Sequence, residues 1–205
     1  MKVLRLTPVF LDIETTGLDP IPTEKKVECE IIAIGVATLR DGLKISVFSQ
    51  DEFDESEVIF RALHKILSDD SHCIVAYNIG FDFPFLTARA LKHNFGSSIV
   101  TELRQLYRVD LMNIVTRYLL PNSRHIKLKD IASFLDIPHD AEISGADVPK
   151  LFEKGKFEAI KQHCQRDIET ICNLFFKLKD LCKHNIQRRC NLHCDIEFEG
   201  FEGDI

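Results

Sequence analysis

The sequence predicts an α/β fold in which helices flank a mixed β-sheet of about five strands that begins with a hairpin. Short apolar segments rich in Val and Ile alternate along the chain with segments whose apolar residues recur at helical spacing. Asp41-Gly42, between the second and third expected strands, is a strong hairpin turn. The chain of 205 residues is long enough to bury the core of one domain.

The expected strands cover residues 3–14, 30–39, 43–49, 73–77 and 107–111. The expected helices cover residues 55–67, 82–93, 112–120, 128–135, 146–152 and 157–183. We therefore expect one domain over residues 1–184, followed by an acidic and mobile tail over residues 185–205.

Composition favours a soluble, cytoplasmic protein. No apolar run reaches the length of a membrane span, and the seven cysteines are an odd number at scattered positions, which suits reduced thiols. The net charge of −6 does not indicate a nucleic-acid-binding protein, but residues 89–129 hold eight Lys or Arg and two acidic residues. Such a local basic surface fits a phosphodiester substrate, and solvated helix faces are the alternative.

Asp12 and Glu14 follow an apolar run, and their spacing places them on the same face of the first expected strand. Two neighbouring carboxylates on a buried strand repel each other, and burial disfavours both charges. A divalent cation relieves both costs, and oxygen ligands suit Mg²⁺ or Mn²⁺. For this pair taken alone, a strand end with two solvated acids is the alternative.

Two later segments add carboxylates. Asp82 ends the run Tyr-Asn-Ile-Gly-Phe-Asp, and Asp167 ends the run His-Cys-Gln-Arg-Asp that starts at His163. His163 and Asp167 are four residues apart on an expected helix and hence share a face. The sequence therefore predicts a site for two divalent metal ions, Mg²⁺ or Mn²⁺, held by the four carboxylates.

The order of these motifs resembles that of the DEDD 3′–5′ exonucleases of the ribonuclease H-like superfamily. Asp-x-Glu-Thr-Thr-Gly begins at Asp12, Asn-x-x-Phe-Asp begins at Asn78, and a helical Asp follows a titratable residue. Over residues 7–180 the chain is most similar to predicted exonucleases related to the proofreading domain of family-B DNA polymerases. That group usually has Tyr where this chain has His163. The histidine branch of the superfamily places its His one residue further from the Asp.

The resemblance implies a ribonuclease H-like sheet and two metal ions held by Asp12, Glu14, Asp82 and Asp167. It places His163 in the slot of the residue that orients the attacking water. An imidazole with a pKa of about 6.5 accepts a proton at neutral pH more readily than a phenol with a pKa of about 10. We therefore predict that His163 is a general base or positions the water, and a structural histidine is the alternative.

The segment Thr15-Thr16-Gly17-Leu18 is predicted to bind substrate. Gly17 lets a ligand approach the backbone closely, and the hydroxyls or amides of Thr15 and Thr16 are suited to a terminal 3′-hydroxyl. By resemblance to the family, this segment meets the terminal nucleotide, and Leu18 wedges against its base.

Five further residues are predicted to contact nucleic acid. Asn78 is suited to bind a phosphate or to orient Asp82, and Phe81 is suited to stack on a base. A turn residue and an ordinary core aromatic are the respective alternatives. Lys127 and Lys129, together with Arg124, are predicted to contact phosphates.

These features predict a 3′–5′ exonuclease that releases nucleoside monophosphates from single-stranded or frayed 3′ ends, with DNA favoured over RNA. A 3′–5′ exoribonuclease, an endonuclease of the same fold and a non-catalytic nucleic-acid-binding subunit of a replication or repair complex are the alternatives. The expected partners are a DNA or RNA 3′ end and a polymerase or repair protein, without a membrane.

A zinc site is a weaker hypothesis for the C-terminal cysteines and histidines. Their spacing matches none of the usual zinc-binding pairs, so a helix end with incidental cysteines is the favoured alternative. The set comprises Cys182, His184, Cys190, His193 and Cys194.

Overall fold

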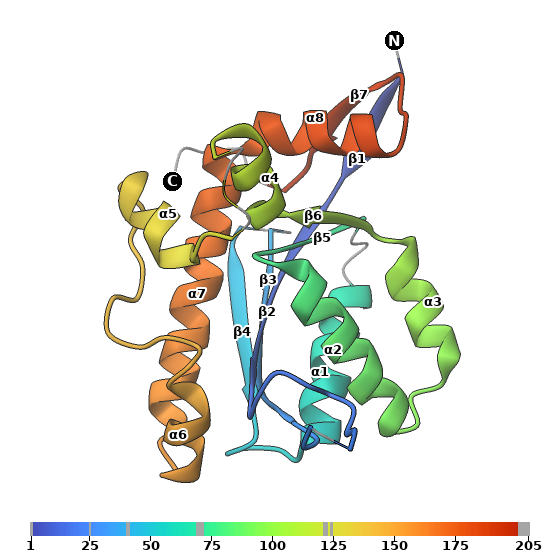
Figure 1. Ribbon diagram of the computed structural model, residues 1–205. Coiled ribbons are helices and arrows are strands. Elements are labelled where there is room, and N and C mark those ends of the chain that lie inside the picture. Colours follow the sequence, from blue (N-terminus) through green and yellow to red (C-terminus); the bar gives the residue numbers. More distant parts are fainter. Residues whose placement is uncertain are drawn as a thin grey trace.

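The computed structural model describes residues 2–24, 26–39, 42–68, 72–120, 123 and 125–200. A mixed five-stranded sheet with the order β4-β3-β2-β5-β6 forms its centre (Figure 1). β2 pairs antiparallel with β3 and β3 with β4, whereas β5 and β6 extend the sheet in parallel. The predicted α/β fold with a hairpin-first mixed sheet is confirmed. The strands are β2 Pro8–Thr15, β3 Ile31–Thr38, β4 Lys44–Ser49, β5 Cys73–Ala76 and β6 Tyr107–Asp110.

Helices cover both faces of this sheet (Figure 1). The side chains of β2 alternate between the two resulting cores: Val9, Leu11 and Ile13 pack with the first three helices, whereas Phe10 packs with the later ones. The face that receives Phe10 therefore also receives Asp12 and Glu14. The first layer comprises α1 Glu55–Ser68, α2 Ile79–Lys92 and α3 Ser97–Gln105, and the second α4 Leu111–Tyr118, α5 Leu128–Phe134, α6 Val148–Glu153 and α7 Phe157–Lys177.

Residues 3–14 form two strands, so the prediction of a single strand is wrong. β1 Val3–Leu6 pairs in parallel with β7 Asp195–Phe198 in a separate two-stranded sheet, whereas β2 begins at Pro8. Proline has no backbone N–H, so Pro8 cannot donate a hydrogen bond to a neighbouring strand. The chain therefore passes from one sheet to the other at this residue without leaving a backbone donor of Pro8 unpaired.

Two other differences concern helices. The helix predicted over residues 157–183 is interrupted at Leu178, after which α8 Lys179–Arg189 runs in a new direction (Figure 1). α3 was not predicted at all, because Leu103 is its one buried residue and its apolar pattern is correspondingly weak.

The mobile tail predicted over residues 185–205 includes the end of α8 and all of β7, and residues 201–205 lie outside the described residues. The predicted boundary falls inside α8, and β7 is held by its pairing with β1. Such pairing joins segments far apart in the chain, so local composition gives no sign of it. None of the helices in the described residues is long and apolar enough to cross a membrane.

A glycine on β3 permits α7 to lie close to the sheet. Gly35 is paired with Asp12 of β2, and α7 packs against it. A β-carbon on Gly35 would lie 2.6 Å from Ile168 Cγ1 and 2.9 Å from Cys164 Sγ, both closer than van der Waals contact allows. The absence of a side chain at this position therefore brings α7 within reach of the carboxylates on β2.

Candidate metal-binding active site

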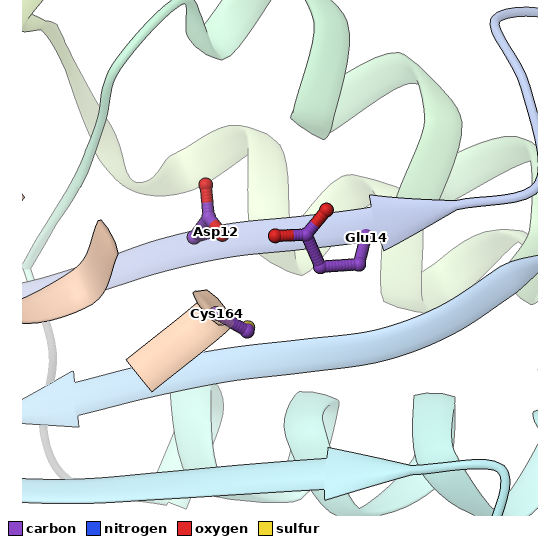
Figure 2. A group of neighbouring side chains, drawn as sticks. All are labelled: Asp12, Glu14 and Cys164. Atoms are coloured by element: carbon purple, nitrogen blue, oxygen red, sulfur yellow. The ribbon is translucent and has the colours of Figure 1, made fainter. Parts of the chain in front are cut away.

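The structure brings the four predicted carboxylates into one electrostatically coupled cluster. Asp12 and Glu14 project from β2 toward α7 (Figure 2), which carries Asp167, and Asp82 lies in the first turn of α2. Potential ligand atoms of Glu14, His163 and Asp167 all lie within 4.8 Å of one another. The charge of Asp82 acts on both Asp12 and Glu14.

Burial shifts all four carboxyl groups toward their neutral forms. It raises the pKa of Asp12 to about 8, and the charge of Asp82 adds to this shift. Burial likewise raises the pKa of Asp82 to about 8 and that of Asp167 to about 7. Burial and the charges of the other three carboxylates together raise the pKa of Glu14 well above its usual range.

This donor set fits divalent cations. Asp12 Oδ2 is buried and has no hydrogen-bond partner among the described residues, although such an oxygen ordinarily has one. The cluster offers oxygen ligands of the type that Mg²⁺ and Mn²⁺ prefer, and positive charge there would remove the repulsion. Asp12, Glu14, Asp82 and Asp167 are thus suited to hold such ions.

In metal-free buffer, we expect the melting temperature to fall as the pH rises from about 4 to about 8. Within this window the folded protein retains protons on its buried carboxyl groups, whereas the unfolded chain, with carboxyl pKa values of about 4, has lost them. The folded state binds more protons, so its stability is highest at the acidic end and is lost as the pH rises.

Thermal unfolding in EDTA across this window tests the expectation. Mn²⁺ should raise the melting temperature most at the alkaline end, because an ion that binds the folded state stabilises it. Asp12→Asn should flatten the pH dependence, and a parent protein with a flat profile in EDTA would contradict the coupling of these groups.

His163 lies at the edge of the carboxylate cluster. Its Nε2 atom is 3.5 Å from Glu14 Oε1 and 3.8 Å from Asp167 Oδ2, and its Nδ1 atom is 3.2 Å from Asp140 Oδ2. The shared helical face predicted for His163 and Asp167 is present in α7. Asp140 was not predicted, because no motif marks it and 23 residues separate it from His163.

Cys164 is a second neighbour of the site that the prediction did not include. Its side chain is fully buried, and its Sγ atom lies within 4.8 Å of ligand atoms of both Asp12 and Glu14 (Figure 2). Burial, followed by the charges of nearby carboxylates, raises the pKa of the Cys164 thiol well above its usual range. The thiol is therefore neutral, and its interaction with Asp12 acts to lower the pKa of that carboxyl group.

A pocket of about 310 Å³ opens beside His163 and Asp167. Lys127 and Lys129 line it, so the structure places these two predicted phosphate contacts next to the carboxylate cluster. Arg124, the third predicted contact, lies outside the described residues. His125, His139, Tyr77 and Asn78 also line the pocket.

The wider basic segment of residues 89–129 does not form one continuous surface. Arg89 is 1% exposed, and its guanidinium group donates hydrogen bonds to Glu55 of α1 and to Glu28. Glu55 also accepts a hydrogen bond from the amide of Ile31, where β3 begins. Arg89 is thus a structural cation that ties the loop after β2 to two helices.

The segment Thr15-Thr16-Gly17-Leu18 begins with the last residue of β2 and continues into the loop that follows. The Thr15 hydroxyl donates to Gly17 O at 2.6 Å, and the Thr16 hydroxyl accepts from the amide of Glu30 at 2.8 Å. These bonds fix the segment, and Leu18 remains 78% exposed. Such exposure is what a wedge against a base requires of this side chain.

Asn78 and Phe81 lie at the start of α2, which begins three residues before the predicted helix. Asn78 adopts a left-handed conformation with φ 67°, and its amide donates to Asp110 Oδ1 at 3.2 Å. Its side chain lines the pocket. Phe81 is partly buried against Phe85, with ring centroids 5.4 Å apart, so part of its ring serves the core.

The C-terminal cysteines and histidines show no metal-binding group. Among the described residues, the two groups of three or more close ligand atoms both belong to the carboxylate cluster. The structure therefore gives no support to the zinc hypothesis for Cys182, His184, Cys190, His193 and Cys194.

Sequence comparison finds a known family over most of the chain. A sequence model of the RNase_H superfamily matches residues 9–191. An uncharacterized protein of Methanocaldococcus jannaschii is 32% identical over 187 residues, which cover 85% of this chain and 97% of that protein. A PolC-type DNA polymerase III of Mycoplasmopsis pulmonis is 26% identical over 164 residues, which cover 70% of this chain and 10% of the polymerase.

Structure comparison finds the same fold in a DNA polymerase. The family B DNA polymerase from the hyperthermophilic archaeon Pyrobaculum calidifontis superposes with a TM-score of 0.64 and 22% identity, covering 85% of this chain and 24% of the polymerase. This likeness shows the fold, and the family match extends over all four carboxylates of the cluster. The motifs, the sheet order and the family match agree: the chain belongs to the RNase H superfamily.

Proposed function

We propose that the protein is a metal-dependent 3′–5′ exonuclease that releases nucleoside monophosphates from single-stranded or frayed 3′ ends, with DNA favoured over RNA. The observation that carries the proposal is the gathering of four carboxylates from β2, α2 and α7 in a cluster whose members raise one another's pKa. The similarity to two DNA polymerases favours DNA, and a polymerase or repair complex as the setting.

The carboxylates Asp12, Glu14, Asp82 and Asp167 would hold two Mg²⁺ or Mn²⁺ ions. Such ions lower the pKa of water and stabilise negative charge on the leaving oxygen. Nε2 of His163 accepts the proton of the attacking water, whose oxygen bonds to phosphorus as the bond from phosphorus to the 3′ oxygen breaks. Lys127 and Lys129 bind phosphates of the strand across the pocket.

A 5′-labelled single strand incubated with Mg²⁺ or Mn²⁺ tests this function. The expected result is a ladder that shortens from the 3′ end, with loss of activity in EDTA. Internal cuts would indicate an endonuclease, and binding without cleavage would indicate a docking subunit. The same sequence as RNA measures the sugar preference, because the 2′-hydroxyl is the group that distinguishes the two substrates. Faster shortening of RNA would identify an exoribonuclease.

Replacing Lys127 and Lys129 with Ala should weaken single-strand binding equally for all sequences. Removing one phosphate interaction should reduce the slope of log affinity against log salt by about 0.7. Fluorescence anisotropy with a labelled strand at several salt concentrations, with Ca²⁺ in place of Mg²⁺ to prevent turnover, measures the slope.

Lys177 and Lys179 provide the matched control. Both are cationic residues outside the pocket, at the junction of α7 and α8. Their double alanine variant should retain the slope of the parent. Equal salt slopes for the parent and both double variants would show that Lys127 and Lys129 are solvated surface residues that do not contact phosphates.

A further inference from the structure

Asp140 is a buried carboxylate held in place by its own loop, between α5 and α6. The residue is 4% exposed, and its Oδ1 accepts hydrogen bonds from the amides of Glu142 at 2.9 Å and Ile143 at 3.3 Å. Its Oδ2 lies 3.2 Å from Nδ1 of His163 and 3.5 Å from a guanidinium nitrogen of Arg166. Oδ1 thus accepts the hydrogen bonds of the loop, and Oδ2 faces the imidazole of His163.

The loop itself is attached to α7. The carbonyl of Pro138 accepts a hydrogen bond from the Thr170 hydroxyl at 3.1 Å. Burial acts to raise the pKa of Asp140, but hydrogen bonds from the two loop amides and from His163 outweigh it and hold that pKa below its usual range. Asp140 is therefore ionised at neutral pH and has no proton to give.

A carboxylate that only accepts hydrogen bonds determines which nitrogen of a neutral imidazole carries the proton. Nδ1 of His163 must donate to Asp140, which leaves Nε2 without a proton. Nε2 lies 3.5 Å from Glu14 Oε1 and 3.8 Å from Asp167 Oδ2. Both separations exceed that of an ordinary hydrogen bond, so the lone pair of Nε2 remains available beside the carboxylate cluster.

We propose that Asp140 is a positioning residue that fixes the tautomer and the orientation of His163, so that Nε2 can accept the proton of the attacking water. This inference rests on the hydrolysis proposed above. Neither Asp140 nor its loop belongs to the motifs that resemble the family, and Asp140 acts only through the imidazole.

Asp140→Asn is an informative variant because the loop fixes how its amide must point. The amides of Glu142 and Ile143 need an acceptor, so the side-chain oxygen of Asn stays with them and the NH₂ group faces His163. That NH₂ group donates to Nδ1, which moves the ring proton to Nε2. The variant therefore retains the loop bonds but presents a donor where the reaction needs an acceptor.

We expect kcat of Asp140→Asn to fall by about 10²-fold or more, with KM nearly unchanged. Asp140→Ala, which imposes no tautomer, should retain more activity than Asp140→Asn even though it loses the loop bonds. A purely structural role predicts the opposite order, because Asn preserves the bonds to Glu142 and Ile143. In a His163→Ala background, Asp140→Asn should have no further effect on kcat.

Asp147→Asn is the matched control, since Asp147 lies nearby in the same segment, accepts hydrogen bonds from the amide and the hydroxyl of Ser144, and makes no hydrogen bond to His163. It should retain the parent kcat. Nitrogen NMR of labelled histidine at alkaline pH gives a readout that does not need activity: the His163 proton should be on Nδ1 in the parent and on Nε2 in Asp140→Asn.

An Asp140→Asn variant with the parent kcat, or with its ring proton still on Nδ1, would overturn the inference. Inactivity of the parent on every 3′ end would instead refute the proposed function, and the NMR comparison would still decide whether Asp140 sets the tautomer.

Discussion

Asp12→Ala and Asp82→Asn should each reduce the rate of 3′-end hydrolysis by about 10³-fold or more, because several kcal/mol of transition-state stabilisation depend on intact metal coordination. Both variants should fold. Asp12 Oδ2 has no partner among the described residues, and burial raises the pKa of each carboxyl to about 8. Loss of one charge therefore relieves repulsion, so the melting temperature in metal-free buffer above about pH 8 should rise.

Single-turnover cleavage of a labelled strand and thermal unfolding in EDTA measure the two effects separately. Glu57→Ala is the control, because Glu57 forms a surface ion pair with Arg61 at 2.8 Å on α1 and has no part in the cluster. It should change neither cleavage nor the pH dependence of unfolding. Near-parent activity in Asp12→Ala would remove the metal site from the mechanism.

His163→Ala should lower the cleavage rate by about 10²–10⁴-fold, the usual contribution of a general base, while metal binding is retained. His163 is 3% exposed, and its Nε2 atom lies between the carboxylates of β2 and α7. His163→Tyr restores the residue usual in the related exonucleases. It should recover part of the rate if the side chain mainly orients water, and little if proton transfer dominates.

Metal binding in these variants is measured by Mn²⁺ titration with electron paramagnetic resonance, which separates loss of chemistry from loss of ions. His64→Ala on α1 is the control, since His64 lies next to Phe60, outside the site. Parent-like cleavage by His163→Ala would make His163 a structural residue and would leave the proton of the water to bulk solvent.

The positions of the carboxylates could be predicted because each carboxylate lies in a segment with a recognisable local sequence pattern. Alternation along a strand places Asp12 beside Glu14, and a spacing of four on a helix places His163 beside Asp167. The motif order then indicated that these segments meet in space. The sheet of five strands followed from the same kind of local periodicity, whereas Asp41 of the predicted hairpin turn lies outside the described residues.

What the sequence did not reveal depends on contacts between distant segments. Asp140 reaches His163 from a loop without periodicity, and its role appears only once the Thr170 hydroxyl is seen to hold that loop. The pairing of β1 with β7 likewise joins opposite parts of the chain. Arg89 was counted as part of a basic surface because its charge is visible in the sequence, whereas its burial against Glu55 is not.

Gly35 shows that the width of the candidate active site is determined partly by a residue that contributes no ligand. Cys164 and Ile168 occupy the space where its side chain would be, and Asp167 belongs to the same stretch of helix. Relatives that keep all four carboxylates but carry a larger residue at this strand position would have the acids displaced from one another. Inspection of the acidic residues alone is therefore insufficient to decide which homologues are active nucleases, and the strand opposite Asp12 should be compared as well.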